Sequence, residues 1–430
     1  MKVAFLVTGS GGSFYCSNCY RDMLYFRAVK MVPGMEATAI PLYLPPEKAY
    51  LESGFDTNVF FGAISLYIRE KVHFLGNMPS FLDKILDSPP MLKMAAKRAG
   101  TTRTEGLEDI TLNMISSHNS SREKEVQRLA RYLVRNGKPD IIHMSNALII
   151  GLARQIKELI DVKIVCSLQN EDDWLNEMAE PFQSQAWKMI AEESQYIDAF
   201  ISPSIYYRNF FAGRAGFSGE NVYVVPSGID ISEVSESGRT SGSPAIGFFS
   251  RVSYNNGFDK LVDAFILLKH EKEFSELTLH VCGGYTSDDK PFITEQIRKI
   301  KGNGFRNSVR IYPGFQGKGK QEFLNEIDLL SVPVRKYDGY GLYILEANAA
   351  GIPVVQPATG AFPEILGMTH GGILYQPDNT ETLVNSLRSL LKDKAKARQY
   401  GNDGRRMVTA SLTHKEMADG MHAVYARLKP

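Results

Sequence analysis

The sequence of 430 residues lacks long apolar runs, a large excess of either charge, and a rich set of cysteines. A bilayer-spanning helix needs about 18 or more consecutive apolar residues, and no stretch of that length occurs. Lysine and arginine number 49 and aspartate and glutamate 48, so no broad basic field points to nucleic acid. We therefore expect a cytoplasmic protein with no nucleic-acid partner.

The few cysteines argue against a fold stapled by disulfides or zinc. Cys166 and Cys282 lie inside apolar runs and are typical of small core residues. Cys16 and Cys19 form a C-x-x-C motif, but no second C-x-x-C or His-x-His motif follows. We expect no structural zinc and interpret the motif as reduced thiols, with a reactive pair as the alternative.

Short apolar runs alternate with segments of helical periodicity along most of the chain. The runs lack polar alternation, as expected of strands buried on both faces, and this order predicts βαβ units in parallel sheets. The first run passes directly into a glycine-rich turn, which favours a strand over a signal peptide. Strands are expected at Val3–Thr8, Ala37–Tyr43, Asp140–Met144, Lys163–Leu168, Ala199–Pro203, Val222–Val225, Ala245–Ser250, Leu277–Cys282, Val309–Tyr312, Leu329–Pro333 and Pro353–Gln356.

A serine- and glycine-rich stretch near residues 229–244 has the composition of a linker. The expected fold class is therefore α/β, with two Rossmann-like parallel-sheet domains facing across a cleft. We place the domains at 1–228, with a helical insertion at about 45–121, and at 229–412, followed by a terminal helix at 413–430. Ligands of such sheets bind beyond the carboxyl ends of the strands, so the loops there are the candidate site.

One stretch, residues 332–355, is the most informative in the sequence. A strand is followed by a loop that carries Asp338 and two glycines, and then by a helix over residues 341–350 that contains Glu346. The N–H groups at a helix start suit a phosphate or a sugar hydroxyl, and paired carboxylates suit vicinal hydroxyls. Alternatively, Asp338 caps the loop and Glu346 is an ordinary solvated residue, although a carboxylate among apolar neighbours needs a partner.

This stretch resembles the donor site of retaining glycosyltransferases of the GT-B fold, especially family four (glycosyl transferases group 1). That family has two glutamates separated by seven residues around a Gly-Phe-Gly-Leu loop. Asp338 stands at the first glutamate, Glu346 at the second, and Gly339-Tyr340-Gly341-Leu342 at the loop. The resemblance is strong over residues 222–407, where the segments Val224–Asp230, Thr359–Ile365 and Gly371–Leu374 also fit.

The resemblance implies roles for particular residues. Asp338 would face the donor sugar, Glu346 the ribose hydroxyls, and Arg251 the diphosphate, which makes Asp338 and Arg251 the expected catalytic residues. The terminal helix would pack back on the first domain. The expected donor-binding residues are Gly11, Gly12, Asn256, Gly339, Tyr340, Gly341, Leu342 and Glu346.

The chain also departs from the family pattern at polar positions. Asn256 replaces a lysine and carries no charge, and Lys260, one helical turn later, is the expected substitute. Gln169 stands where the family often has a histidine at the end of a strand. Glu171 and Asp172 follow it and would face the cleft as acceptor contacts, with a solvated acidic turn or a helix cap as the alternative.

The function expected from the resemblance is transfer of a sugar, by a hexosyltransferase-like enzyme, from a UDP- or GDP-sugar to an unidentified glycan, lipid or small-molecule acceptor. Retention is implied by the family, and no metal or other cofactor is expected because no D-x-D motif is placed to hold a diphosphate. The basic stretch at 84–103 favours a solvated helix, with peripheral membrane contact as the alternative. Other functions of the same architecture are a nucleotide-sugar epimerase, a phosphorylase, or a catalytically weak nucleotide-sugar-binding partner subunit.

Overall fold

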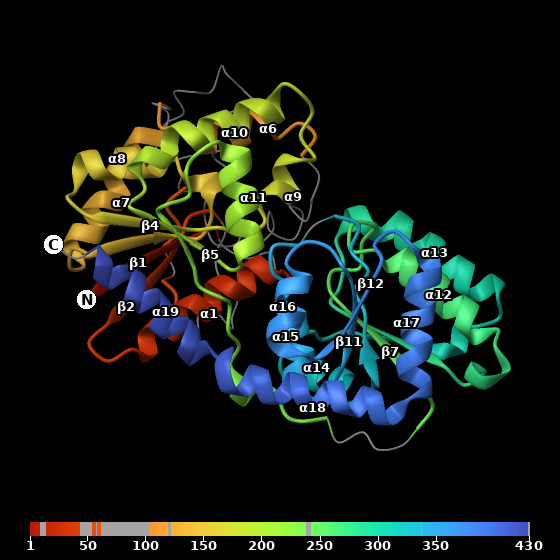
Figure 1. The fold of residues 1–430 in the computed structure, drawn as a ribbon. Coiled ribbons are helices and arrows are strands. Elements are labelled where there is room, and N and C mark those ends of the chain that lie inside the picture. The colour runs from red at the N-terminus through yellow and green to blue at the C-terminus, as the bar shows by residue number, and fades with distance from the viewer. Residues whose placement is uncertain are drawn as a thin grey trace. The chain divides into compact units, whose positions relative to one another are not determined.

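The computed structural model describes residues 1–8, 14–43, 54–56, 58–61, 104–118, 122–237, 242–336 and 338–428 (Figure 1). The chain forms two compact units. Unit 1 consists of Met1–Gly12, Asn18–Pro226 and Met417–Pro430, and unit 2 of Ser13–Ser17 and Ser227–Glu416. Gly11, Gly12 and most of the expected insertion at 45–121, including the basic stretch at 84–103, lie outside the described residues.

Unit 1 is built on a six-stranded parallel sheet with the order β2-β1-β3-β4-β5-β6. Its strands are β1 Lys2–Val7, β2 Glu36–Pro41, β3 Ile141–Met144, β4 Lys163–Ser167, β5 Ala199–Ser202 and β6 Val222–Val224. All residues of β3 and β5 are buried, which explains why their sequences are continuously apolar. The helices are α1 Ser17–Met31, α6 Glu108–Ile115, α7 Glu123–Arg135, α8 Leu152–Leu159, α9 Glu171–Leu175, α10 Phe182–Glu193, α11 Ile205–Ala215 and α19 His414–Arg427.

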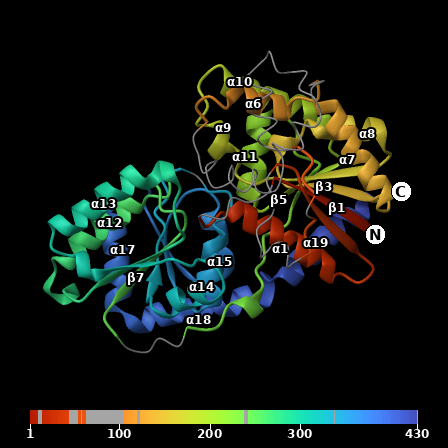
Figure 2. The ribbon, with the colours of Figure 1, turned by 180° about the vertical axis from the view of Figure 1, so that it is seen from behind.

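Unit 2 is built on a second six-stranded parallel sheet, in the order β12-β11-β10-β7-β8-β9. Figures 1 and 2 show α12, α13 and α17 over one face of this sheet and α14 and α15 over the other. The strands are β7 Ala245–Phe249, β8 Thr278–Cys282, β9 Val309–Tyr312, β10 Leu329–Leu330, β11 Val354–Pro357 and β12 Gly372–Tyr375. The helices are α12 Phe258–Lys269, α13 Lys290–Gly302, α14 Gly317–Asn325, α15 Leu342–Ala349, α16 Phe362–Thr369, α17 Thr380–Lys392 and α18 Lys394–Ser411.

The two parallel sheets confirm the expected α/β class with two Rossmann-like domains. The expected strands are found with ends that agree within two residues, except at β10, and β12 was not predicted. β10 ends at Leu330, whereas the prediction extended it to Pro333, which has no N–H to donate to a ladder. In β12, a Cβ on Gly372 would lie 2.1 Å from the carbonyl oxygen of Val354. The close approach of the two strands therefore requires glycine there.

The last helix, α19, packs inside unit 1 from Met417 onward. Its Tyr425 hydroxyl meets Nδ1 of His143 on β3, and Nε2 of the same ring lies 2.7 Å from the Ser167 hydroxyl on β4. Burial lowers the pKa of His143 to about 3, so the ring is neutral at ordinary pH. A neutral, doubly hydrogen-bonded imidazole thus joins the sheet to the end of the chain.

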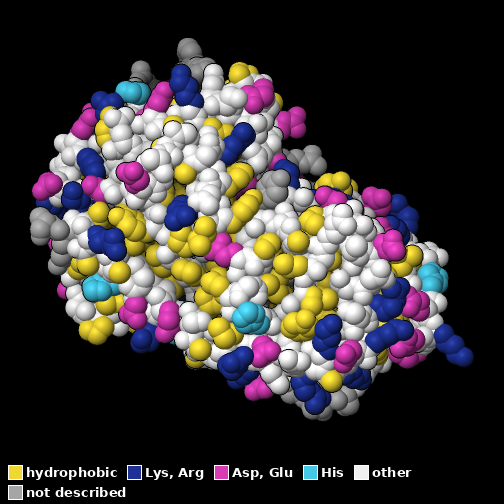
Figure 3. Space-filling model, viewed as in Figure 1, with side chains coloured by type: hydrophobic (Ala, Val, Ile, Leu, Met, Phe, Trp, Pro, Cys, Tyr) yellow, Lys and Arg dark blue, Asp and Glu magenta, His cyan; other side chains and the backbone are white. Residues whose placement is uncertain are grey.

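Charged residues of both signs are interspersed over the face shown in Figure 3, in keeping with a net charge of +1. Among the described residues, no helix is both long enough and apolar enough to cross a membrane.

Candidate functional site

The loops that follow β7 and β10 are tied together at the carboxyl ends of these neighbouring strands. The Arg335 guanidinium donates two hydrogen bonds to the Asp259 carboxylate, at 2.7 and 2.5 Å, and one to the carbonyl oxygen of Tyr254. Its central carbon lies 3.6 Å from the centroid of the Tyr254 ring. A bidentate, stacked arginine holds both loops rigidly, although sequence reasoning had given Arg335 no role.

Arg251 lies just beyond the carboxyl end of β7, separated from the strand by Ser250. Its side chain is 19% exposed, and its Nε lies 3.6 Å from the Asp289 carboxylate, which also accepts the N–H and the hydroxyl of Thr286. The Phe14 ring centroid lies 5.6 Å from the guanidinium carbon, within cation–π range. Arg251 is thus a partly buried cation at the edge where ligands of such sheets bind.

Asn256, which replaces the family lysine, holds the turn that carries Arg251. Its side-chain amide donates to the Ser250 hydroxyl at 3.0 Å and to the Arg251 carbonyl oxygen at 2.8 Å. Lys260, the expected substitute for the missing charge, instead forms an ion pair with Asp378 at 2.5 Å. Asn256 therefore positions Arg251, while the charge of Lys260 is already compensated.

The Asp338 loop opens helix α15. One carboxylate oxygen of Asp338 accepts the backbone N–H groups of Tyr340 and Gly341, each at 2.8 Å. Both amides have a partner within the loop, and their expected contact with a ligand stays a prediction. Asp338 thus has the geometry of a loop cap. Gly339 and Leu342 are buried beside them.

Gly360 places a second helix start against the same loop. A Cβ on Gly360 would lie 2.6 Å from the carbonyl oxygen of Asp338, and the Ala361 N–H donates to that oxygen at 3.0 Å. The backbone of Gly360 has a φ of +59°, which glycine adopts without strain. The loops after β10 and β11 therefore form one continuous surface element.

Glu346 lies in α15 and is 1% exposed. One of its oxygens accepts a hydrogen bond from the Lys320 ammonium on α14 at 2.8 Å, and the other accepts one from the Tyr15 hydroxyl at 2.6 Å. Burial lowers the pKa of Lys320, but the adjacent charge of Glu346 outweighs it and the pKa is raised. Glu346 thus has the partners that we expected a carboxylate among apolar neighbours to need, namely the Lys320 ammonium and the Tyr15 hydroxyl.

Sequence reasoning missed Lys320 and Tyr15. The signal for Lys320 is its spacing: it shares one face of α14 with the buried Phe323 and Leu324, where a lysine must find a counter-charge. No local pattern distinguishes Tyr15.

The carboxyl end of β4 in unit 1 carries a buried polar cluster around Gln169, the residue at the family's histidine position. The Gln169 side-chain amide donates to the Asp22 carboxylate at 2.5 Å, and the backbone carbonyl oxygen of Gln169 accepts from the Asn18 side-chain amide at 2.7 Å. Burial raises the pKa of Asp22 to about 7, against the opposing effects of the Gln169 hydrogen bond and the charge of Arg21. A carboxyl group that titrates near neutrality therefore lies beside Gln169.

Glu171 and Asp172 are 2% and 4% exposed, which excludes the alternative of a solvated acidic turn. The Glu171 carboxylate accepts the N–H groups of Ala147 and Gln169, each at 2.9 Å. The Tyr207 hydroxyl contacts Glu171 at 2.8 Å and Asp172 at 2.9 Å. Burial raises the pKa of Glu171, while these hydrogen bonds oppose the shift. Both side chains brace loops from within, and their role toward an acceptor stays a prediction.

Cys166 and Cys282 are free and buried, as expected. Burial raises the pKa of Cys282 to about 12, so its thiol is unreactive at ordinary pH. Cys16 and Cys19 are disulfide-bonded, which corrects the interpretation of reduced thiols.

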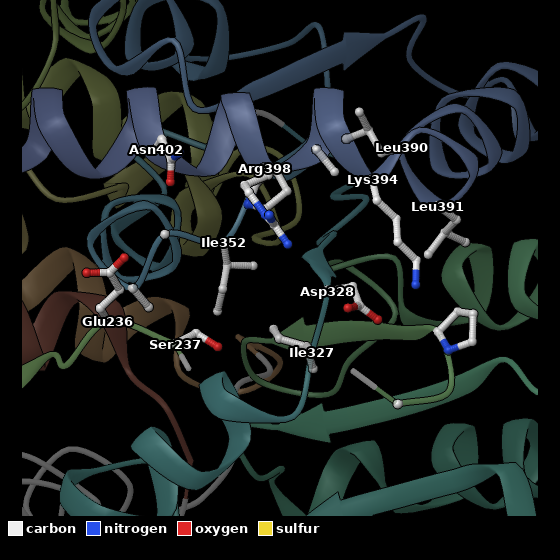
Figure 4. Close-up of a pocket in the computed structure, with 16 residues that line it drawn as sticks. Glu236, Ser237, Ile327, Asp328, Ile352, Leu390, Leu391, Lys394, Arg398 and Asn402 are labelled. Atoms are coloured by element: carbon white, nitrogen blue, oxygen red, sulfur yellow. The ribbon is translucent and has the colours of Figure 1, made fainter. Parts of the chain in front are cut away.

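A pocket of about 320 Å³ lies at the opposite edge of the unit 2 sheet, where strands β7, β10 and β11 begin. Figure 4 shows Lys394 and Arg398 reaching into it from α18, and Glu236 and Asp328 also line it. Its two cations and two carboxylates offer no net positive charge for a diphosphate. Because it lies where these strands begin, the pocket is separate from the loops that carry Arg251 and Asp338 at their other ends.

The fold and these loops define a two-domain α/β protein of the GT-B class, with a glycine-containing helix start and a buried carboxylate at the carboxyl edge of its second sheet. Comparison with family models agrees: Glycosyl transferases group 1 matches residues 231–407, and Glycosyltransferase Family 4 matches residues 95–233. Both matching models are glycosyltransferase models, and they lie on successive parts of the chain.

Curated relatives and solved structures extend this finding. The lipopolysaccharide core biosynthesis mannosyltransferase LpsB of Rhizobium meliloti (strain 1021) is 26% identical over 43% of this chain and 51% of its own length. The glycogen synthase of Mycobacterium tuberculosis is 22% identical over 69% of this chain and 70% of its own. The chain thus spans about half the length of LpsB.

Two solved structures share the fold. Sucrose-phosphate synthase from Thermosynechococcus elongatus superposes with a TM-score of 0.72 at 16% identity, covering 100% of this chain and 99% of the other. Anabaena HepE in complex with UDP and glucose gives 0.71 at 16% identity, with full coverage of both chains.

Proposed function

We propose that the protein transfers a sugar from a nucleotide-sugar donor, a UDP- or GDP-sugar, to a glycan, lipid or small-molecule acceptor. The observation that carries the proposal is that the group 1 family match, residues 231–407, contains Arg251, the Asp338 loop and Glu346, all of which the fold places at or beside the carboxyl ends of unit 2 strands. The HepE complexes with UDP and UDP-glucose, which share this fold, support a nucleotide-sugar ligand.

The chemistry assigned to these residues follows from the bond that must break. The bond between the anomeric carbon and the diphosphate oxygen breaks, and that oxygen keeps the electron pair. A bond forms between the anomeric carbon and the acceptor oxygen, whose proton passes to the departing diphosphate. Negative charge grows on the diphosphate, and a fixed cation at that point lowers the barrier. Arg251 supplies this cation, and Asn256 holds its turn in place.

Glu346 and Asp338 share the donor in this proposal. Glu346 binds the ribose hydroxyls and is held in position by Lys320. Asp338 faces the transferred sugar from the loop that its carboxylate caps. Retention at the anomeric carbon and independence of metal belong to the proposal. The epimerase, phosphorylase and binding-subunit alternatives are not favoured by the relatives found.

The direct test is titration of UDP and GDP by calorimetry. Arg251→Ala should weaken the preferred nucleoside diphosphate by about 10- to 150-fold, since a hydrogen bond to a charged group contributes about 1.5–3 kcal/mol. Arg310→Ala, on β9 and 58% exposed, is the matched control and should bind as the wild type does. Equal affinities of Arg251→Ala and the control would remove Arg251 from the site.

A second pair of variants separates ribose from sugar recognition. Glu346→Gln should weaken nucleoside diphosphate and intact donor alike, because both contain the ribose. Asp338→Asn keeps an oxygen to accept the Tyr340 and Gly341 amides, so it should spare nucleoside diphosphate and weaken only the donor. If Asp338→Asn weakens both ligands equally, the assignment of the two carboxylates is wrong.

A further inference from the structure

A short segment of the chain, Phe14 and Tyr15, lies on the donor-site residues of unit 2. Phe14 forms an antiparallel bridge with Gly284, and the Tyr15 N–H donates to the Gly283 carbonyl oxygen at 2.6 Å. The Tyr15 ring packs on Phe249 of β7, with centroids 4.6 Å apart. The segment therefore lies against the turn that follows β8 as a short extra strand.

Tyr15 is hydrogen-bonded to Glu346, the carboxylate to which the proposed function assigns the ribose hydroxyls. Its hydroxyl donates to one Glu346 oxygen at 2.6 Å, and Lys320 takes the other oxygen at 2.8 Å. With Glu346 1% exposed, a ribose hydroxyl reaches this carboxylate only when a group that covers it moves away. Of the two, the neutral phenol is the easier to replace, because removing the ammonium would leave a buried charge unpaired.

Phe14 covers the second charged group of the same site. Its ring centroid lies 5.6 Å from the Arg251 guanidinium carbon, on a side chain that is 19% exposed. A ring this close to a guanidinium crowds the approach of a bulky anion to it. Two consecutive residues thus engage the two groups assigned to the diphosphate and the ribose.

We propose that the Phe14–Tyr15 segment is a built-in competitor of the nucleotide, in which the Tyr15 hydroxyl takes the place of a ribose hydroxyl on Glu346 and the Phe14 ring crowds the place of the diphosphate beside Arg251. This inference rests on the proposed function and adds to it a control of donor affinity. The donor binds when the segment leaves the site, and the segment returns when the nucleoside diphosphate departs.

The affinity of such a site is reduced by the fraction of molecules in which the segment has left it. Removing a contact of the segment raises that fraction and tightens the ligand. A hydrogen bond to a charged group corresponds to about a tenfold or larger change in an equilibrium constant. If Tyr15 were an ordinary donor-binding residue, the opposite result would be expected, because its loss would weaken ligand binding.

The decisive variant is Tyr15→Phe, which keeps the ring on Phe249 and removes only the hydroxyl. Calorimetric titration with UDP and GDP should show binding tighter than wild type by about tenfold or more. Phe14→Ala should tighten binding as well, through Arg251. Tyr312→Phe is the matched control: it removes a buried hydroxyl of the same unit, bonded to His280 at 2.9 Å, and should leave the affinity unchanged.

The outcomes separate this inference from the proposed function. Unchanged or weaker binding in Tyr15→Phe, with normal binding in wild type, overturns the competitor and leaves the function standing. No binding of either nucleotide to wild type, Tyr15→Phe or Phe14→Ala overturns both. If Tyr15→Phe fails to fold, Phe14→Ala decides alone, with tighter binding supporting the competitor and equal or weaker binding overturning it.

Discussion

The buried pair of Lys320 and Glu346 makes the sharpest prediction about stability. The two side chains are 4% and 1% exposed and lie 2.8 Å apart, so solvent screens neither charge. Lys320→Met keeps the length of the side chain and removes the ammonium, which leaves the Glu346 carboxylate buried without its counter-charge. Removing one partner of such a pair destabilises a protein by about 3–5 kcal/mol.

Thermal unfolding followed by calorimetry measures this loss. For a domain of about 150–250 residues, each kcal/mol shifts Tm by about 2–4 °C, so the transition of unit 2 should fall by about 6–20 °C. The control is Lys392→Met, whose partner Glu273 is 53% exposed while Lys392 is 46% exposed, and which should lose at most about 1 kcal/mol. The double variant Lys320→Met/Glu346→Gln should recover much of the loss, because no buried charge remains.

The pH dependence of the effect has a definite sign. The charge of Glu346 raises the pKa of Lys320 above its usual 10.5, although burial opposes it. A raised pKa of a base contributes stability that is present below 10.5 and is lost as the pH rises through the folded-state pKa. The gap between wild type and Lys320→Met should therefore hold at neutral pH and narrow in strong alkali. Similar Tm values for Lys320→Met and Lys392→Met would refute the reasoning.

Two further predictions concern unit 1. Burial raises the pKa of Asp22 to about 7 from 3.8, so its ionisation destabilises the fold as the pH rises through that window. Asp22→Asn still accepts the Gln169 hydrogen bond and should raise Tm at about pH 8 but not at about pH 4; an equal gain at both pH values contradicts the shift. Tyr425→Phe leaves buried His143 without its hydroxyl partner and should destabilise the protein by about 1–3 kcal/mol in urea unfolding, whereas an unchanged midpoint would show that the α19 contact contributes nothing.

The sheets could be predicted because strands buried on both faces leave a continuous apolar run in the sequence, as in β3 and β5. β12 left no such run. Its opening residue, Gly372, is glycine because the carbonyl oxygen of Val354 approaches closely, and that approach exists only once the sheet has formed. Strand ends set by tertiary contact are therefore beyond a reading of local pattern.

The site residues divide in the same way. The spacing of Asp338 and Glu346 is local and could be read from the sequence, but Lys320 lies 26 residues from Glu346 and Tyr15 lies 331 residues from it. Likewise, the acidic pair Glu171 and Asp172 looked solvated because the tyrosine that covers it comes 35 residues or more later in the chain. A charged side chain is usually exposed, but it can be buried where a residue distant in the sequence supplies a hydrogen bond or a counter-charge.

From the sequence, Asp338 was either a loop cap or a contact to the donor sugar, and the two roles are compatible. Aspartate is one methylene shorter than the family's glutamate, and short acidic side chains readily accept the amides two and three residues ahead. The Tyr340 and Gly341 N–H groups are bonded to Asp338 in this way. The cap therefore fixes the direction of the carboxylate, so the proposed sugar contact depends on the cap.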